Sequence, residues 1–460
     1  MENDRWDIFI REHFDDDVDR LLLNKRKWPD IDIPLAASTI SGHRKIREKV
    51  PSWYGNTGLV FPSSLSLEQC SSEFTASEKT RSICSLLDSD TAPDTLGIAD
   101  LTGGLGVDSY VFSRTFGKVF YNEMNPALAG AAAHNFKVLG CRNITTRCCR
   151  IEDGASDSAG DSVLSGQRAA ELLKEFRPDI IYLDPARRDA SGKKVFRIRE
   201  CQPDVLKIKD DLLSISRFVV IKLSPMADLD AVCTSLGIHC RKIDVISYRG
   251  ECKEVVACLD REYKGGCTIC ARCSGNGEFC FDKAEENAAD VLFADKIASG
   301  HIFTDGEAYL LEPDKALLKA GAFKILCSRF RLRMLERSTH YYVMSGFTED
   351  NPDTEPESAS VRKSRTDGFF KKYRIISILP LDRQGVKAAG RNFPKAEVTA
   401  RNIPMTSDEL RKKLGVKSSD RYHIFGLKVS QKDKAPGNFL FITEKVPSAG
   451  QDDGSTSELL

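Results

Sequence analysis

The segment Gly97-Ile-Ala-Asp-Leu-Thr-Gly-Gly-Leu-Gly106 decides the fold of this 460-residue chain. Its apolar start predicts a strand that ends at Asp100, and glycines at 103, 104 and 106 separate that strand from a helix. Glycines let a backbone turn sharply and approach a ligand closely. In open α/β sheets, cofactors bind outside the carboxyl ends of the strands, where this loop would lie. The segment therefore predicts the cofactor-binding loop of an α/β domain.

The residues that follow alternate apolar runs with helical patterns up to about residue 260. The expected strands are 97–101, 118–122, 144–150, 179–183, 218–223, 241–248 and 254–259. The expected helices between them include 107–116, 126–139, 169–176 and 205–212. Strands that alternate with helices form a parallel sheet with helices on both faces. We therefore expect an α/β domain with such a sheet.

Acidic residues stand after the second and third expected strands. Glu123, 17 residues after Gly106, is placed to accept hydrogen bonds from ribose hydroxyls, and Glu152-Asp153 could read an adenine amino group. Ser109 stands where a Gly-x-Gly-x-x-Gly loop would have its last glycine. Its presence argues against a nicotinamide cofactor. A structural turn followed by two ordinary loop acids is the alternative.

The fourth expected strand runs into Asp184-Pro-Ala-Arg-Arg-Asp189, and the whole order resembles a class I S-adenosylmethionine (SAM)-dependent methyltransferase. Further motifs resemble the bacterial THUMP-like-domain methyltransferase family. They are Leu67-Glu-Gln-Cys-Ser-Ser-Glu73 with Thr75-Ala76 and Lys79, Lys222-Leu-Ser-Pro-Met226, Glu251-Cys-Lys-Glu254, Glu312-Pro313 with Lys319-Ala-Gly321, and Arg401-Asn-Ile-Pro404 before an expected helix at 408–414.

This resemblance implies a Rossmann-like class I methyltransferase sheet with an N-terminal helical segment and C-terminal α+β domains, one ferredoxin-like and one THUMP-like. The expected boundaries are 1–90 for the helical region, 91–262 for the methyltransferase domain, 263–321 for the ferredoxin-like domain, 322–446 for the THUMP-like RNA-binding domain and 447–460 for a disordered tail.

The resemblance also implies SAM as the cofactor. We expect the cofactor-binding residues to be Asp100, Thr102, Gly103, Gly104, Gly106, Glu123 and Asp153. We expect Asp184, Pro185 and Arg187 to be catalytic, and Arg188, Lys222 and Ser224 to bind the substrate. No metal is expected.

The residues after the fourth strand also bear on the atom that is methylated. Enzymes that methylate exocyclic base nitrogens usually carry an aromatic residue two places after this proline, but Arg187 stands here. A guanidinium plane can stack on a base or meet a phosphate. The Asp-Pro-x-Arg pattern is also similar to uridine C5-methyltransferases, whose nucleophilic cysteine is absent from Lys222-Leu-Ser-Pro225. We favour nitrogen methylation, and the alternative is that Arg187 and Arg188 form a surface pair.

Several segments outside the sheet have simple patterns. Amphipathic spacing predicts one helix over 6–27 and another over 65–87; Ser71, Ser72 and Glu73 either cover the cofactor or cap a helix. Glu251, Lys253 and Glu254 are most simply interpreted as salt-bridge structure. Further along, we expect a strand over 267–281, helices over 283–289 and 315–329, and a disordered acidic insertion over 348–360.

Charge is unevenly distributed. The chain has 67 Lys+Arg and 67 Asp+Glu, but residues 315–434 hold 26 basic and 13 acidic residues, a net charge of +13. Such asymmetry indicates a polyanionic partner, and THUMP-type domains are associated with RNA. We therefore expect RNA (tRNA or rRNA) to be bound through its phosphates. A solvated basic surface is the alternative.

The sequence also predicts where the protein is located and whether its cysteines are reduced. No apolar run reaches the ~18 residues of a spanning helix, and the acidic N-terminus has no apolar run of signal-peptide type. We expect a cytoplasmic protein without membrane contact, whose 15 cysteines are reduced.

Cys267, Cys270, Cys273 and Cys280 have metal-ligand spacing. Because the sequence between the first three is strand-like, Cys267, Cys270 and Cys273 would not all share a face, and we expect structural cysteines.

The leading hypothesis is a SAM-dependent RNA methyltransferase. One alternative is an inactive methyltransferase fold that binds RNA, and the intact glycine loop with Glu123 argues against it. The other is a methyltransferase that acts on a protein or a small molecule, which the basic C-terminal region disfavours.

Overall fold

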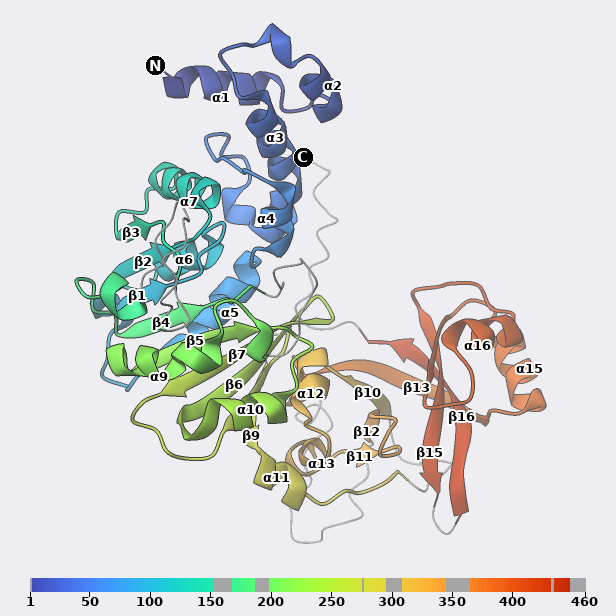
Figure 1. The fold of residues 1–460 in the computed structure, drawn as a ribbon. Helices are drawn as coiled ribbons and strands as arrows, with labels where there is room; N and C mark the ends of the chain where they lie inside the picture. Colours follow the sequence, from blue (N-terminus) through green and yellow to red (C-terminus); the bar gives the residue numbers. More distant parts are fainter. Residues whose placement is uncertain are drawn as a thin grey trace. The chain divides into compact units, whose positions relative to one another are not determined.

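The computed structural model describes residues 2–151, 168–186, 198–274, 277–294, 308–344, 365–431 and 434–446 (Figure 1). The chain divides into two compact units. The first comprises Met1–Tyr248 and Lys253–Thr268, and the second comprises Arg249–Cys252 and Ile269–Leu460. The expected insertion at 348–360 and the expected tail at 447–460 lie outside the described residues.

Helices form the start of the first unit. They are α1 (Glu2–Glu12), α2 (Val18–Leu23), η1 (Lys25–Lys27), α3 (Ile33–Lys49), η2 (Pro51–Trp53), α4 (Ser64–Gln69), α5 (Glu73–Cys84) and η3 (Pro93–Thr95). The expectation of one helix over 6–27 is wrong. Asp17 accepts hydrogen bonds from the backbone N–H groups of Asp19 and Arg20 and thereby begins α2 as a separate helix.

The expected helix over 65–87 is also divided. Ser72 and Thr75 form a capping box that begins α5, so the chain leaves α4 at Cys70 in an extended conformation. This break has a consequence for the site, because it leaves Ser71 outside both helices, with its side chain buried. The capping interpretation of Ser72 and Glu73 is confirmed, since Glu73 lies in the first turn of α5.

The first unit contains the predicted sheet. Its strands are β1 (Gly97–Asp100), β2 (Lys118–Asn122), β3 (Ile144–Arg147), β4 (Ile180–Leu183), β5 (Phe218–Leu223), β6 (Cys240–Tyr248) and β7 (Glu251–Asp260), in the spatial order β3-β2-β1-β4-β5-β7-β6. β1 to β5 pair in parallel, and β7 is antiparallel to β5. The mixed α/β fold with a large parallel sheet is therefore confirmed.

The connecting helices of this unit are α6 (Val107–Phe112), α7 (Pro126–Val138), α8 (Ala169–Leu172), η4 (Ile198–Glu200), α9 (Val205–Ile215), α10 (Leu229–Leu236) and η5 (Gly237–His239). α6 ends before the expected residue 116 because Arg114 and Thr115 donate to carbonyls three residues back and tighten the last turn. The N-terminal segment shares a core with this part of the sheet, where Trp53 and Phe61 are buried together with Tyr110, Tyr121 and Phe136.

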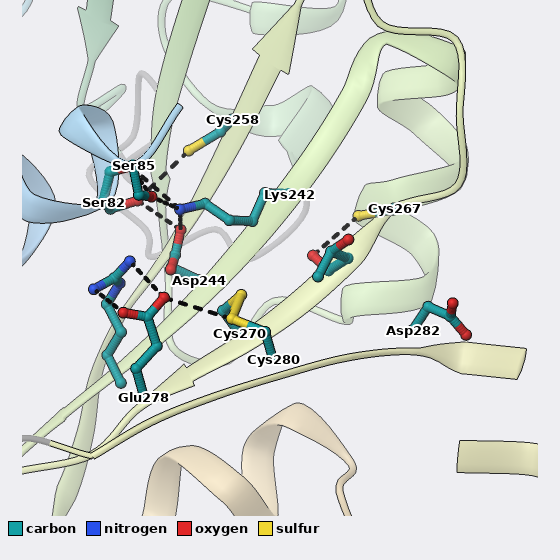
Figure 2. The surroundings of a disulfide bond; sticks show 12 residues. Ser82, Ser85, Lys242, Asp244, Cys258, Cys267, Cys270, Glu278, Cys280 and Asp282 are labelled. Carbon is teal, nitrogen blue, oxygen red and sulfur yellow. Dashed lines mark hydrogen bonds and ion pairs between the residues drawn. A yellow bond between two sulfur atoms is a disulfide. The ribbon is translucent and has the colours of Figure 1, made fainter. Parts of the chain in front are cut away.

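A buried polar cluster fixes α5 against β6. Lys242 donates to Ser85 Oγ at 2.7 Å and pairs with Asp244 at 3.1 Å, and Ser82 Oγ donates to Asp244 Oδ2 at 2.6 Å (Figure 2). Because every charge in this cluster has a partner, it holds the helix without an unpaired buried ion. Its effect is to fix the position of Lys79, which lies on the same helix.

The second unit begins with β8 (Thr268–Arg272), β9 (Glu278–Asp282) and α11 (Lys283–Ala288). The expected single strand over 267–281 is wrong, because Cys273 N donates to Gly277 O and turns the chain. A disulfide joins Cys270 to Cys280 (Figure 2). The expectation that all cysteines are reduced is therefore wrong for this pair.

A second, seven-stranded sheet completes the second unit. Its elements are β10 (Tyr309–Pro313), α12 (Lys315–Ala320), α13 (Lys324–Phe330), β11 (Arg333–Met334), β12 (Tyr342–Met344), β13 (Phe370–Pro380), α15 (Arg383–Asn392), β14 (Glu397–Arg401), α16 (Ser407–Leu414), β15 (Tyr422–Gln431) and β16 (Lys434–Lys445). The strand order is β11-β12-β10-β13-β16-β15-β14, with only β14 and β15 paired in parallel. The helix expected over 315–329 is two helices, because Gly321 takes a left-handed conformation and ends α12.

None of the helices within the described ranges combines the length and the apolar character that crossing a bilayer requires.

Candidate active site

The glycine loop after β1 is built around Tyr121. Gly103 N donates to Asn122 O at 2.7 Å, and Gly106 N donates to Gly103 O at 2.8 Å. A Cβ at residue 103 would lie 2.1 Å from the Tyr121 ring, so only glycine fits between the loop and β2. Gly106 has a φ of +89° and begins α6. The loop is therefore held in a single tight turn at the carboxyl edge of the sheet.

Gly104 differs from its neighbours because its outer side is open. Its φ is +54°, and a Cβ there would meet no described atom within 4 Å. Its N–H donates to Glu123 Oε2 at 2.9 Å, while Glu123 Oε1 accepts from Asn125 N at 2.8 Å. Each carboxylate oxygen thus keeps one lone pair for a ligand. Met124 follows with 57% of its surface exposed and offers apolar area beside the acid.

Asp100 lies beneath this loop. It is only 1% exposed, and its carboxyl group accepts hydrogen bonds from Ser109 Oγ at 2.7 Å and from Thr102 N at 3.2 Å. Burial raises the pKa of Asp100 to about 8, although these hydrogen bonds oppose the shift. Asp100 therefore links the start of the glycine loop at Thr102 to Ser109 in α6.

Thr102 links the glycine loop to the end of β4. Its Oγ1 accepts a hydrogen bond of 2.6 Å from Asp184 N, the first residue beyond the strand. Pro185 is buried, and Ala186 is fixed by a pair of backbone hydrogen bonds with Gln202. The backbone on both sides of Asp184 is therefore held in place.

The Asp184 carboxylate is 29% exposed and pairs with a buried lysine. Lys222 Nζ donates to Asp184 Oδ2 at 2.7 Å, and the Lys222 side chain is 5% exposed. Within the described part of the chain, Asp184 Oδ1 accepts no hydrogen bond. One carboxylate oxygen is thus held by Lys222, and no described residue donates a hydrogen bond to the other.

Lys222 belongs to a larger set of buried charges that we call the carboxyl-edge cluster, formed by Lys79, Asp108, Asp184, Lys222 and Glu254. Lys79 is 0% exposed and contacts Asp108 Oδ1 at 2.9 Å and Glu254 Oε2 at 2.8 Å. Glu254 Oε1 lies 3.5 Å from Lys222 Nζ. The salt-bridge interpretation of Glu254 is therefore confirmed.

Neutral groups complete the cluster. Ser71 Oγ accepts from Lys79 Nζ at 2.6 Å and from Lys222 Nζ at 3.3 Å, and it donates to Asp108 Oδ2 at 2.8 Å. Tyr182 OH also donates to Asp108 Oδ2, at 3.0 Å. The extended segment between α4 and α5 thus places the Ser71 hydroxyl within hydrogen-bond distance of both Lys79 and Lys222.

The opposite charges in this cluster keep Lys222 and Glu254 ionised despite their burial. Burial lowers the pKa of Lys222, but the carboxylates of Asp184, Glu254 and Asp108 outweigh it, and the pKa lies above its usual value. Burial likewise raises the pKa of Glu254, but the two lysines lower it to about 2. Lys222 therefore keeps its positive charge next to Asp184.

The sequence alone did not indicate the roles of Lys79, Asp108 and Tyr182. A usable signal for Lys79 is its position on α5, because Ala76, Lys79, Thr80 and Ile83 share helical spacing and are all buried. A lysine on such a face needs a buried acidic partner. No spacing rule could identify Glu254 as that partner, since it lies 175 residues away.

The remaining expected residues are distributed as follows. Ser224 is buried, and its Oγ accepts from Met226 N at 3.1 Å, so it shapes the turn after β5. Asp153, Arg187 and Arg188 lie outside the described residues. The structure thus brings Gly104, Glu123, Thr102, Asp184 and Lys222 to the carboxyl edge of the sheet, and it buries Asp100 and Ser224.

Two segments of the second unit match known domain models. Residues 370–445 match the THUMP domain-like family, and residues 309–352 match a ferredoxin-like domain. The second match begins within the range 263–321 expected for that domain and extends beyond it. A search of curated proteins finds no match to this chain.

The whole chain also resembles a solved structure. A protein from Porphyromonas gingivalis W83, provisionally described as a methyltransferase, is 26% identical, with 96% of this chain and 98% of that chain covered and a TM-score of 0.73. A SAM-dependent methyltransferase from Aquifex aeolicus is 11% identical, with 40% of this chain and 89% of that chain covered and a TM-score of 0.26. The chain therefore carries THUMP-like and ferredoxin-like domains and has a methyltransferase fold.

Proposed function

We propose that this protein is a SAM-dependent methyltransferase that modifies a base nitrogen in tRNA or rRNA. The single observation that carries this proposal is the position of Asp184. Its carboxylate accepts a hydrogen bond from Lys222, and its backbone N–H donates to Thr102 in the glycine loop, whose outer side is open at Gly104. A carboxylate fixed beside a cofactor loop is suited to positioning an acceptor for in-line transfer.

The loop residues fit the cofactor. The open side of Gly104 allows a ligand to approach the backbone closely. Glu123 offers one free lone pair on each oxygen for ribose hydroxyls, and the exposed Met124 offers an apolar surface for a purine ring. SAM would supply the methyl group on its sulfonium.

Residues of this chain would then orient the acceptor and remove its proton. Asp184 Oδ1 would accept a hydrogen bond from an exocyclic amine and orient its lone pair, and the same carboxylate would take the proton that the nitrogen loses after methylation. Lys222 is fully engaged with Asp184, Ser71 and Glu254, so we assign it a positioning role. Arg187 and Arg188 remain candidates for contact with the base or its phosphate.

RNA as the substrate is supported by the THUMP-like segment. Residues 370–445 hold 17 basic and 7 acidic residues, a net charge of +10. On α15, Arg383, Lys387 and Arg391 are exposed and follow one another at intervals of four residues, so they share one face. Such a face would contact phosphates and contribute affinity without reading sequence.

The first experiment measures SAM binding by calorimetry. Gly104→Val should abolish binding, because its side chain would fill the open space above the loop. The matched control is Gly140→Val, since Gly140 also has a positive φ, +72°, and open space around it but lies after α7, away from the loop. Equal SAM affinity in the two variants would refute the cofactor site.

The second experiment identifies the acceptor. Nucleosides from total tRNA and rRNA of a deletion strain are compared by mass spectrometry with those of the parent strain, and the missing methylated base is restored with purified protein and SAM. Bound SAM with no missing nucleoside would favour a protein or small-molecule acceptor. Absent SAM binding with retained RNA binding would favour an inactive methyltransferase fold.

A further inference from the structure

Three cysteine side chains meet in the first unit, although they are far apart in sequence. Cys233 lies on α10, Cys240 is the first residue of β6, and Cys267 follows β7. Their sulfur atoms all lie within 4.8 Å of one another, and the sulfurs of Cys240 and Cys267 are 3.7 Å apart. The metal-like spacing considered from sequence grouped Cys267 with Cys270, Cys273 and Cys280, so it did not indicate this trio.

The distances suit a shared metal ion. Two thiolates that bind one zinc ion at ~2.3 Å in tetrahedral geometry have sulfurs about 3.8 Å apart. The Cys240–Cys267 pair already has this separation at 3.7 Å, and the Cys233 sulfur lies within 4.8 Å of both. No disulfide joins any two of the three.

Cysteines bind a divalent ion as thiolates, so metal binding here would release the proton of each coordinating thiol.

We propose that Cys233, Cys240 and Cys267 bind one zinc-class cation, with water as the fourth ligand. Thiolate donors select soft or borderline metals such as zinc. Cys240 is buried, while Cys233 and Cys267 are partly exposed, which gives water access to one side of the ion. The metal would connect α10, β6 and the segment after β7, and it would thereby stabilise their packing in the first unit.

The test uses the full-length protein purified with a reducing agent. Metal analysis should find about one zinc per chain, and reconstitution with cobalt should give the absorption of a thiolate-bound tetrahedral Co²⁺ ion. Cys267→Ser and Cys233→Ser should each lose the cobalt band and most of the zinc. A chelator should lower the melting temperature of the wild type and leave that of Cys267→Ser unchanged.

The control addresses a second group of possible ligands. Cys270, Glu278 and Cys280 also lie close together, and the two cysteine sulfurs could bind metal once the disulfide between them is reduced. The double variant Cys270→Ser/Cys280→Ser should keep the zinc and the cobalt band. The proposal is refuted if wild type binds no stoichiometric zinc and gives no cobalt band, if the double variant alone loses the metal, or if mass spectrometry finds a Cys240–Cys267 disulfide in place of metal.

Discussion

Charged residues are arranged in opposite ways at the carboxyl edge of the first unit and in the THUMP-like segment of the second unit. In the carboxyl-edge cluster, two lysines and three acids are mostly buried, and each has at least one partner within 3.5 Å. In residues 370–445, basic residues outnumber acidic ones by ten, and many of them are exposed. One region balances its charges internally, and the other presents an excess to solvent.

The difference indicates that charged residues have two different roles in this protein. Buried pairs are strong and directional because water does not screen them, so they fix one side chain relative to another. Exposed charges are weak individually and are screened by salt, so they act as a set on a partner of opposite charge. Substitutions in the first region should therefore change stability and turnover, and those in the second should change the salt dependence of binding.

The largest effect is expected at Lys79. Lys79→Met would remove the buried cation that contacts both Asp108 and Glu254, and the free energy of unfolding should fall by about 3–5 kcal/mol. Lys45→Met is the matched control, because Lys45 pairs with Glu68 in an exposed ion pair of 3.2 Å. Its loss should change stability by less than about 1 kcal/mol. Chemical denaturation measures both, and similar losses would contradict the comparison.

Asp184→Ala is expected to abolish most methyl transfer while leaving SAM affinity nearly unchanged. A positioned acid–base group contributes about 10²–10⁴-fold to a rate, so single-turnover methylation should slow by at least about 100-fold. Asp228→Ala is the control, since Asp228 is an exposed carboxylate that caps α10. That variant should melt earlier and keep its turnover. Full activity in well-folded Asp184→Ala protein would remove Asp184 from the mechanism.

Asp100 should make stability depend on pH. Its folded pKa of about 8 exceeds the unfolded value of ~3.9, so the folded protein keeps a proton that the unfolded chain releases between these values. The free energy of unfolding therefore falls as pH rises through this window, by up to ~1.4 kcal/mol per unit. Asp100→Asn lacks this titration, so its stability relative to wild type should increase from pH 5 to pH 8. If the stabilities of wild type and Asp100→Asn changed with pH in parallel, Asp100 would be ionised in the folded protein.

Much of the first unit's fold follows from local sequence patterns. The strands at 97–101, 118–122 and 218–223 were predictable because apolar β-formers are bounded by glycine, asparagine or polar turns. The divisions at Asp17 and Ser72 were missed because side-chain capping overrides continuous helical spacing. The Cys270–Cys280 disulfide was missed because strand pairing, and not cysteine spacing, brings the sulfurs together.

The candidate site was predictable where it is local and not where it depends on distant contacts. Glu123 and Asp184 could be selected because each directly follows a strand of one parallel sheet, and Gly104 because it lies in the glycine loop after the first strand. Asp100 could be selected as a strand-end acid too, but its burial and its hydrogen bond with Ser109 could not be inferred from that position. The partnership of Lys79 and Glu254 depends on how α5 packs against the sheet, which no spacing encodes.

The smallest effect is expected in the basic region. Lys387→Gln/Arg391→Gln removes two exposed charges from one face of α15. Glutamine has a helix propensity close to that of lysine and arginine, so the helix should persist. If both side chains contact phosphates, the slope of log affinity against log salt should become shallower by about 1–2, and RNA affinity at low salt should fall several-fold.

The control for this variant removes two charges elsewhere. Lys25 and Lys27 are exposed in η1 of the first unit, and Lys25→Gln/Lys27→Gln changes the net charge of the protein by the same amount. Because salt-dependent binding counts the counterions released at contacted phosphates, this control should leave the slope unchanged. Equal changes in the two variants would mean that RNA responds to the total charge of the protein and that the THUMP-like segment is not its binding surface. Filter binding over a salt series distinguishes these outcomes.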